Sequence, residues 1–133
     1  MKIALISIFL DDGYEHILDD EFMENVVCQE DHYYHRIAHL LRMGNHDPIV
    51  FYISVEKELK KFTHKYGHTV IRVPAKRIPF LHEPIVYSPE LIKQVENNFD
   101  ASLLFSYYVM YKVPDMFDYI IRKLKGKMPI MTR

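Results

Sequence analysis

The sequence has few of the residues on which several common functional motifs depend. Among its 133 residues there are four glycines and a single cysteine, Cys28. One cysteine excludes an internal disulfide framework and suits a reducing compartment. With so few glycines, no stretch matches the G-x-G-x-x-G dinucleotide cradle, a P-loop or the G-x-S-x-G nucleophile elbow. The familiar glycine-based nucleotide and hydrolase sites are therefore excluded.

The chain also lacks an excess of one charge and lacks long apolar runs. Seventeen Lys and Arg residues stand against 18 Asp and Glu residues, so no overall field attracts nucleic acid or an anionic membrane. No segment approaches the roughly 20 apolar residues of a membrane-spanning helix, and the opening MKIALISIFL lacks a signal-peptide cleavage site. We expect one cytoplasmic domain, residues 1–133, with no nucleic-acid partner and no transmembrane segment. Peripheral contact with a membrane stays open.

Five short apolar runs alternate with four segments of helical character. The predicted strands are Lys2–Phe9, Pro48–Ser54, Thr69–Pro74, Ala101–Tyr108 and Lys127–Thr132. The predicted helices are DHYYHRIAHLLRMG (31–44), VEKELKKFTHKYG (55–67), SPELIKQVENNF (88–99) and VPDMFDYIIRKLKG (113–126). Several strands are apolar almost throughout, as strands covered on both faces must be. This alternation predicts an α/β fold with a doubly wound, Rossmann-like, three-layer parallel sheet.

Two connections are longer than the fold needs. Leu10–Glu30 follows the first predicted strand and Pro74–Tyr87 follows the third, whereas typical links in such folds take about 2–6 residues. Both begin at the carboxyl ends of strands, where doubly wound folds bind their ligands. We expect both to be functional, and the second, with three prolines, to be an ordered extended loop.

The first predicted helix has two distinct faces. One is apolar and comprises Tyr33, Tyr34, Ile37, Ala38, Leu40 and Leu41; the other is polar and comprises His32, His35, Arg36 and His39. Histidines spaced i, i+3 and i+7 share a helix face and could bind a metal. No cysteine or carboxylate completes that set, so we interpret the polar face as solvated and expect neither a metal nor a cofactor.

Other candidate groups give no complete catalytic set. Asp11 and Asp12 resemble the acidic pair of a phosphoacceptor receiver domain, but the third predicted strand ends in IRVPAK without the further aspartate that such a domain needs. Cys28 is predicted to be a small buried side chain rather than a nucleophile. The tyrosines of SYYVMY (106–111) either line a ligand cleft or fill the junction between sheet and helix.

Taken in order, several stretches resemble the N-terminal half of a GT-B glycosyltransferase, closest to the retaining enzymes of family 4. MKIALIS, GYEH and HRIAHLLRMGNHDPIVFY are similar to that family's first strand, G-G-x-E-x-H-like turn, helix and G-H-x-x-x-V entry to the second strand. GHTVIRVP is similar to the third strand, SPELIKQVENNFDASLLFSYY to the helix and fourth strand, and KGKMPIMTR to the fifth. The chain departs from the family in having Asp12-Gly13 for the usual Gly-Gly turn and an insertion at Ile17–Glu30.

The resemblance implies transfer of a sugar from a nucleotide-linked donor to an acceptor, with retained configuration and without a metal. The donor would bind mainly to a C-terminal domain that this sequence lacks, so we expect the chain alone to be an inactive fragment of a two-domain enzyme. The implied substrate-binding residues are Asp12, Gly13 and Tyr14 near the donor phosphate, and Glu15, His16, Tyr107 and Tyr108 facing the acceptor. The alternative is a non-catalytic small-molecule-binding or regulatory module on the same sheet.

Overall fold

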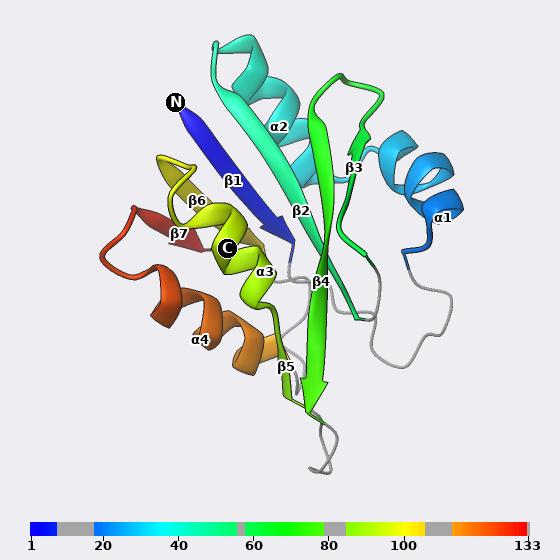
Figure 1. Ribbon diagram of the computed structural model, residues 1–133. Coiled ribbons are helices and arrows are strands. Elements are labelled where there is room, and N and C mark those ends of the chain that lie inside the picture. Colours follow the sequence, from blue (N-terminus) through cyan, green and yellow to red (C-terminus); the bar gives the residue numbers. More distant parts are fainter. Residues whose placement is uncertain (8–17, 56–57, 79–84, 106–112, 133) are drawn as a thin grey trace.

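The computed structural model describes residues 1–7, 18–55, 58–78, 85–105 and 113–132. They form an α/β fold around a mostly parallel sheet (Figure 1). The strands are β1 (Lys2–Ser7), β2 (Asp47–Val55), β3 (Lys60–Thr63), β4 (Thr69–Ile78), β5 (Ile85–Tyr87), β6 (Ala101–Phe105) and β7 (Ile130–Thr132). The helices are α1 (Asp20–Asn25), the 3-10 turn η1 (Val27–Gln29), α2 (Tyr33–Met43), α3 (Pro89–Val95) and α4 (Val113–Leu124).

The order of the strands in the sheet differs from their order in the chain. Six strands lie in the order β3-β4-β2-β1-β6-β7, and β5 pairs with β4 outside this path. The pairs that β1 forms with β2 and β6 are parallel, as are the β2–β4 and β6–β7 pairs. From β1 the chain first proceeds through β2 to β4 on one side, and later adds β6 and β7 on the other. The direction of winding therefore reverses between β1 and β6.

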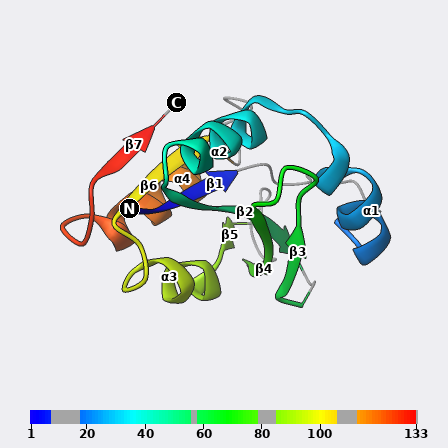
Figure 2. The same ribbon diagram turned by 90° about the horizontal axis from the view of Figure 1, so that it is seen from above.

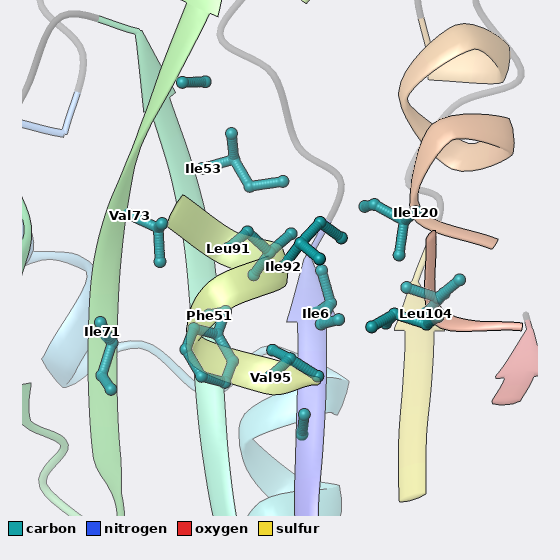
Figure 3. Close-up of a cluster of buried hydrophobic side chains, with 13 residues drawn as sticks. Ile6, Phe51, Ile53, Ile71, Val73, Leu91, Ile92, Val95, Leu104 and Ile120 are labelled. Atoms are coloured by element: carbon teal, nitrogen blue, oxygen red, sulfur yellow. The ribbon is translucent and has the colours of Figure 1, made fainter. Parts of the chain in front are cut away.

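Side chains of successive strand residues enter two separate hydrophobic clusters. Ala4 and Ile6 of β1 pack in a cluster with residues of α3 and α4, whereas Leu5 packs in a cluster with residues of α1, η1 and α2. Because neighbouring residues of a strand point to opposite faces, these clusters lie on the two faces of the sheet. Figure 3 shows the first cluster, and Figure 2 shows α2 and α3 on opposite sides of the sheet.

The predicted strands and three of the predicted helices are confirmed within the described residues. Helices α2, α3 and α4 lie inside the expected segments 31–44, 88–99 and 113–126. The start of α3 follows the expected chemistry, because the hydroxyl of Ser88 accepts a hydrogen bond of 3.2 Å from the amide of Leu91 and Pro89 follows at the first helical position. None of the described helices combines the length and apolar character that crossing a membrane requires.

The prediction of a helix at 55–67 is wrong. Residues 60–63 form β3, which pairs antiparallel with β4 from Lys60↔Arg72 to Thr63↔Thr69. In β3 only Phe62 is buried, while its neighbours Lys61 and Thr63 are exposed. This two-residue alternation suits a strand at the edge of a sheet, where the lysines also discourage pairing with other chains.

The two long connections contain more structure than expected. Leu10–Glu30 includes α1 and η1. The expected loop Pro74–Tyr87 is instead largely paired, because β4 continues to Ile78 and forms antiparallel pairs with β5 from Lys76↔Tyr87 to Ile78↔Ile85.

Candidate functional site

The carboxyl edge of the sheet between β1 and β6 is the first candidate site. Ligands of open α/β sheets bind outside the carboxyl ends of the strands, where the winding reverses. Here those strands end side by side, with Ser7 of β1 paired to Phe105 of β6. The expected site residues follow directly in the sequence: Asp12, Gly13, Tyr14, Glu15 and His16 after β1, and Tyr107 and Tyr108 after β6. These seven residues lie outside the described residues, so the structure gives only the strands that lead to them.

The chain that emerges from residues 8–17 is anchored by a buried arginine. Arg72 of β4, only 4% exposed, donates hydrogen bonds from Nη1 to the carbonyl of Leu18 at 2.8 Å and to Oδ1 of Asp20 at 2.7 Å. Its Nε donates to the carbonyl of Glu58 at 3.0 Å. Hydrogen bonds from Lys60 and Arg72 lower the pKa of the Asp20 carboxyl. One guanidinium thus ties Leu18 and Asp20, which follow residues 8–17 in the sequence, to β4.

Three buried histidines form a second and chemically richer candidate site. His35, His64 and His68, here called the histidine cluster, are 0%, 1% and 2% exposed. The ring centroids lie 4.1 Å apart for His35 and His64, 4.5 Å for His64 and His68, and 5.1 Å for His35 and His68. One ring nitrogen from each histidine can be chosen so that all three lie within 4.8 Å of one another. Within the described part of the chain, this is the group of side chains best suited to hold a metal ion.

Two of these histidines face each other across the hairpin of β3 and β4. The amide of His64 donates to the carbonyl of His68 at 2.9 Å, and the amide of Gly67 donates to the carbonyl of His64 at 2.7 Å. Gly67 has a φ of +96°, a backbone conformation that residues with a side chain rarely adopt. Glycine at this position therefore permits the tight turn. The third histidine, His35, comes from the first turns of α2. The ring of His35 on α2 thereby packs against the rings of His64 and His68 at the hairpin.

Hydrogen bonds to the backbone fix the tautomer of His64. Its Nε2 lies 2.9 Å from the carbonyl of Glu30, and its Nδ1 lies 3.1 Å from the amide of Tyr66. Since a carbonyl only accepts and an amide only donates, Nε2 carries the proton and Nδ1 the lone pair.

The other two rings are linked to each other and to a tyrosine. Nδ1 of His35 lies 2.9 Å from Nε2 of His68, and Nε2 of His35 lies 2.9 Å from the hydroxyl of Tyr52. The remaining nitrogen, Nδ1 of His68, is buried and has no hydrogen-bond partner among the described residues. A buried polar atom of this kind marks a place where an ion or water can bind.

The hydroxyl of Tyr52 connects the histidine cluster to a tyrosine and a carboxylate. It lies 2.7 Å from the hydroxyl of Tyr34 and 3.5 Å from Oε1 of Glu30. The other oxygen of Glu30 pairs with Nε2 of His32 at 2.9 Å. Tyr52 also lies beside Ser7 in the β1–β2 register, so this network approaches the carboxyl end of β1.

Burial sets the protonation states of these groups. It lowers the pKa of His35 to about 2 and that of His68 to about 4, and it also lowers the pKa of His64. Burial raises the pKa of Glu30 and holds the pKa of Tyr52 well above its usual value. All three imidazoles of the cluster are therefore neutral at pH 7, which is the form that coordinates metals.

The interpretation of the histidines on α2 as one solvated face is wrong for His35. The β3–β4 hairpin packs against that face and buries His35 completely, while Leu40, assigned to the apolar face, is 64% exposed. His39 stays partly exposed, and its ring lies 4.8 Å from that of Tyr66. The structure thus groups His35 with His64 and His68 rather than with His32 and His39.

Sequence patterns do not identify His64 and His68 as candidate site residues: His64 lies in the segment 55–67, for which they predict a helix, and His68 directly follows that segment. Two histidines flanking the sequence K-Y-G would have indicated a turn with facing imidazoles. The expectation for Cys28 is confirmed, because the side chain is buried and burial, followed by the charges of Glu24 and Glu30, raises its pKa to about 11.

No known family model matches the chain, and neither a curated protein nor a solved structure is significantly similar to it.

Proposed function

We propose that the chain is a doubly wound, Rossmann-like domain that binds a sugar substrate at the carboxyl edge between β1 and β6. The observation that carries this proposal is the reversal of winding between these two parallel neighbours. The residues that resemble the glycosyltransferase motifs directly follow β1 and β6 in the sequence. The resemblance and the strand order thus point independently to the same edge.

In this proposal the chain is the acceptor-side half of a retaining glycosyltransferase, with the donor held mainly by a second domain. The chemistry is displacement of a nucleotide from the anomeric carbon and its replacement by an acceptor oxygen. Negative charge develops on the departing phosphate, and amides or cations near it stabilise that charge. Gly13 would let the backbone approach the reacting groups, since it has no side chain. Glu15, His16, Tyr107 and Tyr108 would bind the acceptor.

Chemical-shift mapping on the ¹⁵N-labelled chain tests this proposal. We expect acceptor sugars and sugar phosphates at millimolar concentration to shift amide signals in residues 8–17 and 106–112, next to the ends of β1 and β6. Nucleotide-sugars should bind weakly or not at all, because in this proposal a second domain mainly holds the donor. Shifts confined to other edges of the sheet would contradict the proposed site. Micromolar binding of a nucleotide-sugar would contradict the proposal that a second domain mainly binds the donor.

A further inference from the structure

We propose that His35, His64 and His68 together bind one divalent transition-metal ion, with Zn²⁺ as the probe ion. This site is separate from the proposed sugar site and does not depend on it.

The spacing of the nitrogens fits one ion. Bonds from Zn²⁺ to imidazole nitrogens measure about 2.0–2.1 Å, so two nitrogens on a tetrahedral ion lie about 3.3 Å apart. In the histidine cluster the contact between His35 and His68 is 2.9 Å, and the ligand atoms of all three residues lie within 4.8 Å. These separations bracket the required value, so small movements of the rings would admit the ion.

The outward hydrogen bonds follow the pattern of metal-bound histidines. Such a histidine usually donates its second ring N–H to a carbonyl or another oxygen, which fixes the ring and its tautomer. His64 donates from Nε2 to the carbonyl of Glu30, and Nε2 of His35 faces the hydroxyl of Tyr52. In both rings this leaves Nδ1 as the coordinating atom. Binding exchanges the bond from the Tyr66 amide to His64, and the bond between His35 and His68, for bonds to the metal.

The two ring nitrogens of His68 have different surroundings. Its Nδ1 is buried without a hydrogen-bond partner among the described residues, although its Nε2 contacts His35. Leaving a buried polar atom unpaired costs roughly 1–3 kcal/mol in proteins. Because Nε2 is the nitrogen that faces Nδ1 of His35, it would coordinate the ion, and Nδ1 would carry the ring proton.

The ligand atoms determine the class of metal. A set of three imidazoles suits Zn²⁺, Cu²⁺, Ni²⁺ or Fe²⁺ and disfavours Mg²⁺ and Ca²⁺, which prefer oxygen. The ligands come from α2 and from both ends of the β3–β4 turn, so the ion would tie these elements together. We infer a stabilising rather than a catalytic metal.

Metal titration of the chelator-treated chain tests this inference. We expect one Zn²⁺ per chain by calorimetry and elemental analysis, a rise in melting temperature, and an absorption spectrum of the Co²⁺ form without a sulfur-to-metal charge-transfer band. His68→Gln should weaken Zn²⁺ binding by more than roughly 10-fold. Losing a residue that only orients a metal ligand already costs about 10-fold or more in affinity, and His68 is proposed to be a ligand itself. The matched control His39→Gln, on the same helix as His35 but outside the cluster, should bind as the unaltered chain does.

Three results would overturn the inference: no stoichiometric binding to the unaltered chain, equal affinity in His68→Gln, or a Co²⁺ spectrum with sulfur ligation. If His68→Gln does not fold, the stoichiometry and the Co²⁺ spectrum of the unaltered chain decide alone. Because no sugar enters these measurements, their failure leaves the proposed function untouched.

Discussion

Acid should destabilise the metal-free protein between pH 7 and pH 5 through the histidine cluster. Burial lowers the pKa of His35 from 6.5 to about 2 and that of His68 from 6.5 to about 4. A group whose folded-state pKa is lower than its unfolded pKa takes up its proton first in the unfolded chain. The unfolded state therefore gains stability as the pH falls below about 6.5, and the folded state loses it.

The size of this loss follows from the number of protons taken up. At pH 5.5 an unfolded histidine holds about 0.9 of a proton, while His35 and His68 in the folded chain hold almost none. Each proton changes the free energy of unfolding by about 1.4 kcal/mol per pH unit, so each histidine contributes a loss of about 2 kcal/mol between pH 7 and pH 5. The pair contributes about 4 kcal/mol, a large part of the 5–15 kcal/mol typical of a domain. His64, whose pKa is also lowered, acts in the same direction.

Urea denaturation at half-unit pH intervals, in the presence of a chelator, measures this dependence. His68→Gln should reduce the slope near pH 5.5 by about 1 kcal/mol per pH unit, and His39→Gln should leave it unchanged. The range stops at pH 5 because the protonation of Glu30, whose pKa is raised, acts in the opposite direction as the pH falls further. A free energy of unfolding that stays constant from pH 7 to pH 5, or a slope in His68→Gln equal to that of the unaltered chain, would refute the reasoning.

Three substitutions test other parts of the structure. Gly67→Ala should cost about 1–2 kcal/mol in urea denaturation, because its φ of +96° disfavours a side chain. An added Cβ would also clash with the guanidinium of Arg42, which must move; an unchanged midpoint would contradict the described turn. Arg72→Met should cost about 2–4 kcal/mol by leaving the carbonyls of Leu18 and Glu58 without their donor. The control Arg122→Met removes an exposed pair with Asp118 and should cost under about 1 kcal/mol; similar losses in both would argue against the anchoring role. In a two-domain enzyme that contains this chain, Gly13→Val should abolish sugar transfer measured by mass spectrometry while the circular dichroism spectrum is kept, and undiminished transfer would remove that turn from the site.

Local features of the sequence predict most of the sheet. Fully apolar stretches such as Ala4–Ile6 become strands because both faces of the sheet are covered, and Ser88-Pro89 starts α3 through contacts within one turn of chain. The prediction errors occur where the structure of a segment depends on a partner elsewhere in the chain. Residues 60–63 gain their backbone hydrogen bonds from β4, and that pairing outweighs the helical character of VEKELKKF.

The histidine cluster is a long-range product of the fold. His35 and His68, whose nitrogens lie 2.9 Å apart, are separated by 33 residues in the sequence. The period of α2 places His35 among polar residues, and only the hairpin that covers this face makes it buried. By contrast, the resemblance of local motifs is enough to suggest which strand ends carry the proposed sugar site, because those motifs follow the strands in the sequence.

The stacking of His35, His64 and His68 also has a consequence for the evolution of this domain. Residues that share one hydrogen-bond network do not contribute additively to stability. Replacing one of them by an apolar residue leaves buried nitrogens of the others without partners, as the contact between His35 and His68 illustrates. The three positions are therefore expected to covary in related sequences. Descendants should retain all three imidazoles or replace the whole set, and intermediates with one or two should be rare.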